Sequence, residues 1–369
     1  MFAAGLIHLP AVSSAPDVRR RPSTNSVIMK FSPYLFPILS LALATPTIAC
    51  DLCGCYTPRL EVAPEKSVGF YAGAAEQFTS FGTDRVDGRK VDNPTGQYLD
   101  SSNTQFFIGA KFFHDRFSIQ VNVPYIYRSF RRPEGFDIEH GHESGLGDVS
   151  LLASLVVFRK DALFHETGGG LSKDGKTALP LERGEPDFTT SLTLSAGLKA
   201  PTGDESRVLE EFHEVDVEGA PESGIHGHDL ALGTGSWDGV FGAQFALRYK
   251  ALFFDAEAQF TWRGQGHYSY RYANDFSWSG GPGVYLMRSS RGSVGLQCVV
   301  SGETKGTDTF LGESAVDTGL TALYVGPQIV ASFGHINAEI GADIPVLINT
   351  TSFQTTPDYR LRAGITLRF

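Results

Sequence analysis

The sequence predicts an all-β protein, an antiparallel up-and-down β-barrel of about twelve strands that crosses a membrane. Three observations indicate this fold: apolar and polar residues alternate over long runs, the polar positions carry full charges, and the connections alternate between short and long. Gly is abundant (41 residues) and Met and Cys are scarce, which suits many strands and tight turns. Outside an N-terminal segment, no apolar run approaches the roughly 20 residues of a transmembrane helix.

The N-terminal segment is predicted to be an export signal rather than part of the fold. Residues 29–49 begin with the basic Lys30, continue with an apolar stretch over 34–44 and end in small residues at Ala49, which is the pattern of a Sec-type signal peptide. Residues 1–28 lack this pattern. We therefore predict that translation starts at Met29 and that residues 1–28 are an extension outside the working protein.

A Cys-containing periplasmic segment, residues 50–65, is predicted to follow the signal. Cys50, Cys53 and Cys55 lie within six residues. They could form a disulfide in the oxidising periplasm, or ligate a soft metal such as zinc or copper(I). Acylation of Cys50 is a third reading, although the Leu usual three positions before a lipoprotein cysteine is absent. No other cofactor is indicated.

The barrel itself is predicted to span residues 66–369. Period-two alternation places successive side chains on opposite faces of a sheet, and residues 117–128, 254–263 and 336–344 show it well. Turn residues and alternation together predict strands at about 67–79, 102–113, 116–129, 147–159, 188–199, 238–249, 251–263, 275–288, 292–302, 319–333, 335–348 and 358–369.

Strand length favours a membrane barrel over a soluble periplasmic β-sandwich, which is an alternative because sandwich strands also alternate. Many of the runs reach roughly 10 residues, the length of a tilted membrane-crossing strand, and exceed the mean strand of about 5–6 residues. Charged residues in mid-strand are expected where one face borders a watery lumen. That lumen is predicted to be lined by Lys111, Arg128, Lys199, Arg248, Asp255, Glu257, Arg263, Glu339, Asp343, Arg360 and Arg362.

The connections predict the orientation of the barrel. Short turns at 114–115, 249–250, 289–291 and 334 alternate with longer loops, and outer-membrane barrels have short periplasmic turns and long external loops. The segment 160–187 departs from this rule, as a long link where a short turn is expected. Two interpretations are open: a periplasmic excursion, or a strand count that is off by two at this point. The predicted long loops are 80–101, 130–146, 200–237, 264–274 and 303–318.

Histidines and acidic residues in two long loops form a second candidate metal site. His140 and His142 are spaced as His-x-His, as are His226 and His228. In an extended segment this spacing puts both imidazoles on one side, where they can chelate a divalent cation. A plain solvated, acidic loop explains the same residues without any ligand.

Catalysis and nucleic-acid binding are both disfavoured. No Ser-His-acid spacing or Gly-x-Ser-x-Gly elbow marks a nucleophile, so we predict that the protein is not an enzyme. The net charge of −10, without a basic stripe, argues against nucleic acid as a partner.

Three further segments resemble a known family. They are Gly145-Leu-Gly-Asp-Val-Ser-Leu151, Leu198-Lys-Ala-Pro-Thr-Gly-Asp204 and Leu232-Gly-Thr-Gly-Ser-Trp-Asp238. In this order and spacing they resemble the outer-membrane proteins named for the MetA pathway of phenol degradation, over about residues 100–369. The resemblance implies a barrel that passes small solutes, with hydrophobic or aromatic compounds as candidates. The alternative interpretation is that the same segments form the rim of the barrel and bind no ligand, because Gly and Pro suit the turns there.

The sequence as a whole predicts an outer-membrane channel or transporter of a Gram-negative-type bacterium, reached after Sec export. Its expected partners are outer-membrane lipid, a small-molecule solute and the barrel-insertion machinery, which reads a terminal aromatic residue such as Phe369. The rival function is a metal-linked outer-membrane protein that uses the Cys cluster and the His-containing loops.

Overall fold

The computed structural model describes residues 69–369 except 172–177, 214–216 and 290, and gives no side chains for 163–185. The predicted signal peptide and Cys50, Cys53 and Cys55 lie outside the described residues and stay predictions.

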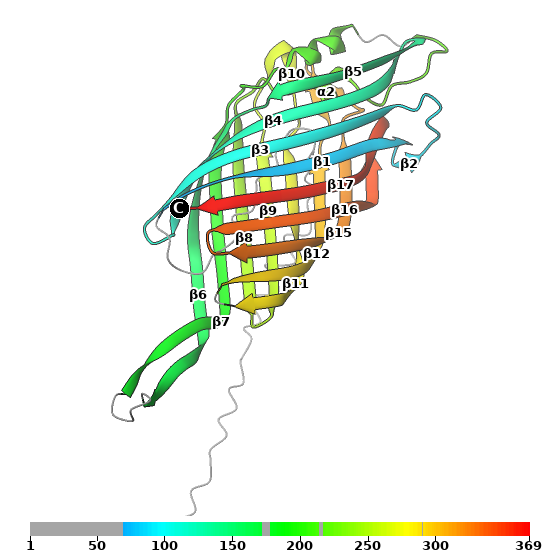
Figure 1. The fold of residues 1–369 in the computed structure, drawn as a ribbon. Helices are drawn as coiled ribbons and strands as arrows, with labels where there is room; N and C mark the ends of the chain where they lie inside the picture. Colours follow the sequence, from blue (N-terminus) through cyan, green and yellow to red (C-terminus); the bar gives the residue numbers. More distant parts are fainter. Residues whose placement is uncertain (1–68, 172–177, 214–216, 290) are drawn as a thin grey trace, which may run out of the picture. The chain divides into compact units, whose positions relative to one another are not determined.

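The chain forms a closed barrel of twelve antiparallel strands (Figure 1). Each strand pairs with the next one along the wall, so that the sheet runs in order around the barrel. The twelve strands are β1 (Phe70–Val86), β3 (Tyr98–Phe112), β4 (Phe117–Glu134), β6 (Ser150–Leu171), β7 (Ala178–Lys199), β8 (Asp238–Tyr249), β9 (Leu252–Trp262), β11 (Asp275–Ser289), β12 (Gly292–Lys305), β15 (Leu320–Phe333), β16 (Ile336–Thr350) and β17 (Phe353–Arg368).

Pairing of the first strand with the last closes the wall. β1 and β17 run antiparallel from the pair Tyr71 and Arg368 to the pair Val86 and Phe353. Beyond the end of β17, the backbone N–H of Phe369 donates to the carbonyl of Phe70 at 2.9 Å. The predicted fold class and all twelve predicted strands are therefore confirmed. A closed wall leaves no long edge to be covered, and it does not favour the alternative of a two-layered sandwich.

Several strands extend further than the alternation predicted, chiefly at the end with long loops. β4 reaches Glu134 rather than 129, and β17 begins at Phe353 rather than 358. The segment 160–187 also forms strand: β6 and β7 continue past the wall as a paired hairpin at the end with short turns (Figure 1). The strand count is therefore correct at this point, and the expected short turn is replaced by a long hairpin.

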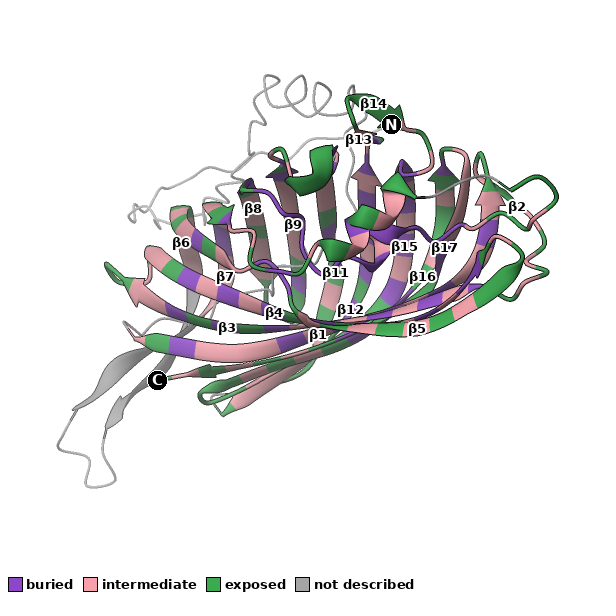
Figure 2. Ribbon diagram, turned by 90° about the horizontal axis from the view of Figure 1, so that it is seen from above, coloured by how far each residue is buried: buried purple, intermediate pink, exposed green. Residues whose placement is uncertain are grey.

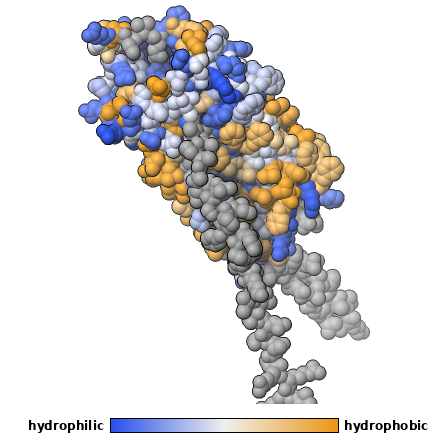
Figure 3. Space-filling view, turned by 180° about the vertical axis from the view of Figure 1, so that it is seen from behind, coloured by the Kyte–Doolittle hydropathy of each residue, from blue (hydrophilic) through white to orange (hydrophobic). Residues whose placement is uncertain are grey.

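The outer surface of the wall carries a belt of exposed apolar side chains. Figure 3 shows it on one face as a hydrophobic region below a more hydrophilic end. Such a belt would be unstable in water and is the surface expected to face lipid. We call it the outer belt; it includes Phe106, Ile108, Leu151, Leu155, Leu194, Phe241, Phe254, Leu286, Leu296, Ile329, Ile340, Ile344, Leu361 and Ile365.

The long loops build a structured cap at one end of the barrel (Figure 2). We use the term cap for residues 200–237, 264–274 and 306–319.

No helix among the described residues is long and apolar enough to span a membrane. The short elements at this end are β2 (Arg89–Lys90), β5 (Asp137–Leu146), η2 (Ser206–Phe212), α2 (Gly227–Leu230), η3 (His267–Ser269), β10 (Tyr270–Arg271), β13 (Asp308–Phe310) and β14 (Glu313–Ala315).

Two apolar clusters hold the cap in place. Ile225 and Leu230 of the cap pack against Phe81, Leu99 and Phe130 of the first three wall strands. A second cluster joins cap segments to one another and comprises Val208, Ala231, Tyr270 and Tyr272, with Phe310 packed against it. The segment around α2 therefore lies against the inward face of the wall.

Candidate functional site: the lumen and its cap

The register of the wall determines which side chains face the lumen. Asp255 alternates with the exposed Phe254, and Arg360 alternates with the exposed Leu361. The strand pairings carry this alternation around the barrel and place ten of the eleven predicted lumen residues on the inward face. The eleventh, Arg263, follows the end of β9 and pairs with the inward Asp238. Whether they line a path for a solute stays a prediction. The structure separates them into a hollow region and a filled one.

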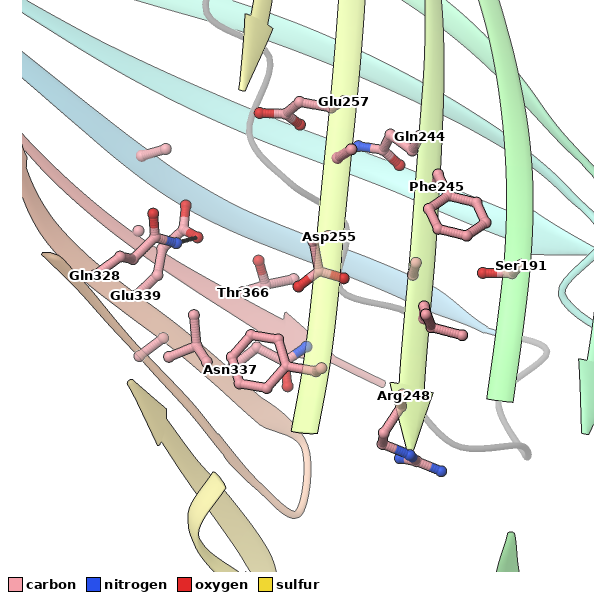
Figure 4. A pocket seen from close by; sticks show the side chains of 18 of the residues that line it. Ser191, Gln244, Phe245, Arg248, Asp255, Glu257, Gln328, Asn337, Glu339 and Thr366 are labelled. Atoms are coloured by element: carbon pink, nitrogen blue, oxygen red, sulfur yellow. Dashed lines mark hydrogen bonds between the residues drawn. The ribbon is translucent and has the colours of Figure 1, made fainter. Parts of the chain in front are cut away.

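The hollow region lies in the half of the barrel with short turns and encloses about 1120 Å³ of empty space, including the part open to solvent. Four predicted residues line it: Arg248, Asp255, Glu257 and Glu339 (Figure 4). Lys111 lies near the turn end of β3 and is half-buried. The lining also includes residues that the sequence analysis did not single out, namely Ser191, Gln244, Phe253, Tyr285, Gln328, Asn337 and Thr366.

Hydrogen bonds hold several polar side chains of this cavity in position. Glu257 accepts from the Ser279 hydroxyl at 2.7 Å, and Glu339 accepts from Gln328 Nε2 at 2.8 Å. On the other side, Arg248 Nη2 donates to Thr189 Oγ1 at 3.2 Å. The aromatic rings of Phe253 and Tyr285 add an apolar patch. The cavity thus offers carboxylates, amides and aromatic rings to a solute.

The filled region begins at the rim, where Lys199 and Arg263 are buried among carboxylates. Lys199 Nζ lies 3.1 Å from Asp238 Oδ2 and 3.4 Å from Asp148 Oδ2. Arg263 Nη1 lies 2.9 Å from Asp238 Oδ2 and its guanidinium also pairs with Asp275. Two cations and three carboxylates therefore compensate one another inside the wall, as buried charges must. We call these five residues the rim cluster.

Three members of the rim cluster, Asp148, Lys199 and Asp238, come one each from the three segments that carried the family resemblance. Asp148 of the first segment accepts from the backbone N–H groups of Thr202 and Gly203 in the second. It also accepts from the N–H and hydroxyl of Thr234 in the third, each at 2.8 Å. A Cβ on Gly203 would lie 2.7 Å from the Cα of Gly233, so both glycines permit a close backbone approach. These segments act as rim architecture, and their joint assembly is what the sequence analysis missed.

A second group of paired charges lies on the adjoining stretch of wall, formed by β12, β15, β16 and β17. Arg360 bonds both Glu303 and the Tyr324 hydroxyl, at 2.7 Å for the latter, and its guanidinium lies 3.6 Å from the Tyr324 ring centroid. Arg362 Nη2 lies 2.9 Å from Asp343 Oδ2. Arg360, Arg362 and Asp343, which were predicted to line the lumen, are therefore engaged in contacts with neighbouring side chains.

Arg128 joins the wall to the cap. It is 1% exposed, and its Nη1 donates to the carbonyls of Asp229 and Ala231 at the end of α2. A guanidinium that binds backbone carbonyls fixes a loop without needing a matching side chain. The cap segment is therefore fastened to β4 from inside the barrel.

A surface-proximal ion-pair network reinforces the same junction. Arg132 of β4 pairs with Glu139 of β5 at 2.7 Å and with Glu210 of η2 at 2.6 Å. Arg207 pairs with Glu143 and Glu210. Burial opposes the charge on Arg207, but these carboxylates outweigh it and raise the pKa of Arg207 above its usual range.

The structure brings together only part of the predicted metal set. His140 and His142 are exposed on β5, where His142 stacks on Tyr127. His226 and His228 are buried in the cap, with ring centroids 5.6 Å apart. Among the described residues, the candidate group with metal-ligand chemistry is His226, His228 and Asp229.

Carboxylates dominate the electrostatics of this group. Burial disfavours the imidazolium form of His228, but Asp229 and Glu211 outweigh burial and raise the pKa of His228 to about 10. Burial likewise disfavours the charged form of Glu211, yet the charge and hydrogen bonds of His228 lower its pKa to about 2. The site is therefore one that attracts positive charge.

No protein-family model matches the chain, and no curated protein is significantly similar to it in sequence. The resemblance to the MetA-pathway family therefore stays a prediction.

The barrel is similar to solved structures of bacterial outer-membrane proteins. An outer membrane channel from Pseudomonas putida F1 superposes with a TM-score of 0.54 at 13% identity, covering 85% of this chain and 100% of that one. The β domain of the Bordetella autotransporter BrkA has a TM-score of 0.42 at 11% identity, covering 81% and 99%. At these identities the first likeness shows the fold alone, and the second carries no argument. The predicted absence of enzyme activity stays a prediction.

Proposed function

We propose that the protein is an outer-membrane barrel that gives small solutes, hydrophobic or aromatic compounds among them, a path across the membrane. The observation that carries this proposal is a closed wall, apolar outside, around a hollow lined by carboxylate, amide and aromatic side chains. Aromatic rings beside carboxylates and amides suit a solute with an apolar body and a polar end. The alternative, a metal-linked outer-membrane protein, is not favoured, because no histidine lines the hollow region of the described structure.

Permeation of lipid vesicles by the purified barrel tests this function. Liposomes that contain the barrel should swell in isosmotic solutions of small aromatic solutes faster than empty liposomes. The variant Ala246→Trp places a bulky side chain in the cavity, since Ala246 faces inward beside Asp255. Its matched control is Ala243→Trp, three positions away in β8 and on the outward face, beside Ala258. We expect Ala246→Trp alone to slow swelling; equal rates for both variants contradict a path through the cavity.

We further propose Sec export from Met29 and insertion that uses the exposed terminal Phe369. Phe369 is 71% exposed at the end of the closing strand. Expression from Met29 should give an outer-membrane band that migrates faster when it is not heated than after boiling. Phe369→Ala should lower the amount of that band, whereas a soluble periplasmic product from the unaltered chain would contradict both the location and the path.

A further inference from the structure

Two loops of the cap meet at the buried histidine pair. His226, His228 and Asp229 belong to α2 and its N-cap, Glu211 lies in η2, and Asp317 comes from the loop that follows β14. None of these residues lines the cavity. We propose that His226, His228 and Asp229 bind one divalent transition-metal cation of the zinc type, which fixes the turn 226–229 between Glu211 and Asp317.

The spacing of the donor atoms suits such an ion. One ligand atom from each of the three residues lies within 4.8 Å of the others. His228 Nε2 and Asp229 Oδ1 are 3.3 Å apart. Two atoms bound at 2.0–2.1 Å to a tetrahedral zinc are also about 3.3 Å apart. This pair therefore has the separation of two ligands that share one ion, and the ring of His226 has to approach by a small movement.

Carboxylates orient both imidazoles as they do in metal sites. His226 Nδ1 lies 3.1 Å from Asp317 Oδ2, and His228 Nδ1 lies 2.9 Å from Glu211 Oε1. The backbone N–H of His228 donates to the same Glu211 oxygen at 2.9 Å, which fixes that carboxylate. A ligating histidine commonly has its other ring nitrogen on a carboxylate, which sets the tautomer and increases ligand basicity. Here both histidines have this arrangement, with Nε2 as the ligating position.

Charge compensation favours a divalent occupant. Glu211, Asp229 and Asp317 bring three negative charges to two nearly buried imidazoles. A single divalent cation bound here offsets two of these three charges. Imidazole and carboxylate ligands together select zinc-like ions over magnesium or calcium.

Zinc binding by the purified, untagged full chain tests the proposal. Because the cysteines at 50, 53 and 55 are a separate candidate site, the measurement uses both the intact chain and one with Cys50, Cys53 and Cys55 replaced by Ser. After chelation and equilibrium dialysis against Zn²⁺, the Cys-free chain should bind one ion. His228→Ala and Asp229→Asn should abolish this binding, whereas His140→Ala and His142→Ala on exposed β5 should not change it.

The orienting carboxylates give a graded second readout. Glu211→Gln and Asp317→Asn keep shape but remove the charge beside Nδ1, and each should weaken zinc binding by about 10–100-fold. Zinc should also slow proteolysis within residues 200–237 of the unaltered chain. The compact unheated band shows for every variant that the barrel is folded. A folded Cys-free chain that binds no zinc, or binds it equally after His228→Ala, overturns the proposal and leaves the pair as a salt bridge only.

Discussion

The two halves of the barrel use inward polar residues in opposite ways. Toward the long loops, the rim cluster, Arg128 and the Arg360 group are buried and paired, and cap residues pack against the wall. Toward the short turns, Asp255 and Glu257 border a hollow. The same alternation of polar and apolar residues thus builds a support in one half and a container in the other. Whether a charged side chain supports the structure or borders the hollow therefore depends on its buried partners rather than on its residue type.

Breaking the rim cluster should produce the largest effect on stability. Asp238→Asn removes the carboxylate that Lys199 and Arg263 share, and it leaves two cations inside the wall without that charge. Loss of one partner from a buried ion pair costs about 3–5 kcal/mol. Urea titration, followed by loss of the compact unheated band, measures the change. Asp92→Asn, at an exposed position, should leave the midpoint unchanged; similar midpoints for both variants would mean that the cluster is not a support.

The outer belt and the exposed apolar residues of the cap can be compared directly. Ile340 and Leu311 are each 60% exposed, the first in the outer belt and the second in the cap. Ile340→Lys should cost about 2–4 kcal/mol near the middle of a bilayer. Leu311→Lys should cost almost nothing, because its side chain already faces water. Folding titrations into lipid vesicles give both values, and a harmless Ile340→Lys would place the belt outside the lipid.

Release of the cap from the wall should have a smaller effect on stability and a visible effect on permeation. Arg128→Met keeps an unbranched apolar stem but removes the donors to Asp229 and Ala231. Hydrogen bonds to a charged group are worth about 1.5–3 kcal/mol. We expect a loss in that range in urea titrations, together with faster liposome swelling. Unchanged swelling in a destabilised barrel would show that the cap does not restrict the path.

The mildest change is expected in the hollow half. Glu257→Gln retains the acceptor for Ser279 and removes one negative charge from the cavity. A unit charge about 4 Å from an ion in water is worth about 1 kcal/mol. Cation-over-anion permeability, from reversal potentials in planar bilayers, should therefore fall about five-fold. Glu313→Gln in exposed β14 serves as the control, and an equal shift there would mean that Glu257 lies off the path.

The sequence predicted the wall well because alternation is a local signal. Its strand limits were too short at the loop end, where outward positions such as Thr83 and Gln354 are polar and the contrast between faces disappears. The link 160–187 was recognised as unusually long, but its strands were not predicted, because a hairpin longer than the wall has no counterpart in the membrane-spanning pattern.

The cap required contacts that no local pattern contains. Asp148 bonds to Thr234, which lies 86 positions further along the chain. Arg128 binds backbone carbonyls, which every residue has, so no side-chain pattern in the sequence identifies this contact. The His-x-His spacing predicted that His226 and His228 share a side, but Asp317, the partner of His226, belongs to another loop. Gln244 and Gln328 have the same parity as the predicted lumen charges and could have been identified by that rule.

Pairing of β17 with β1 also governs how the molecule is made. The two strands that complete the wall are separated by almost the whole barrel sequence, so closure is the most non-local event of assembly and is expected to be slow. Until β17 arrives, the growing sheet has two unpaired edges, which can recruit other unfinished chains. A chain cut short before Phe353 is therefore expected to aggregate rather than form a smaller barrel, and escort factors that shield open edges become a requirement of biogenesis.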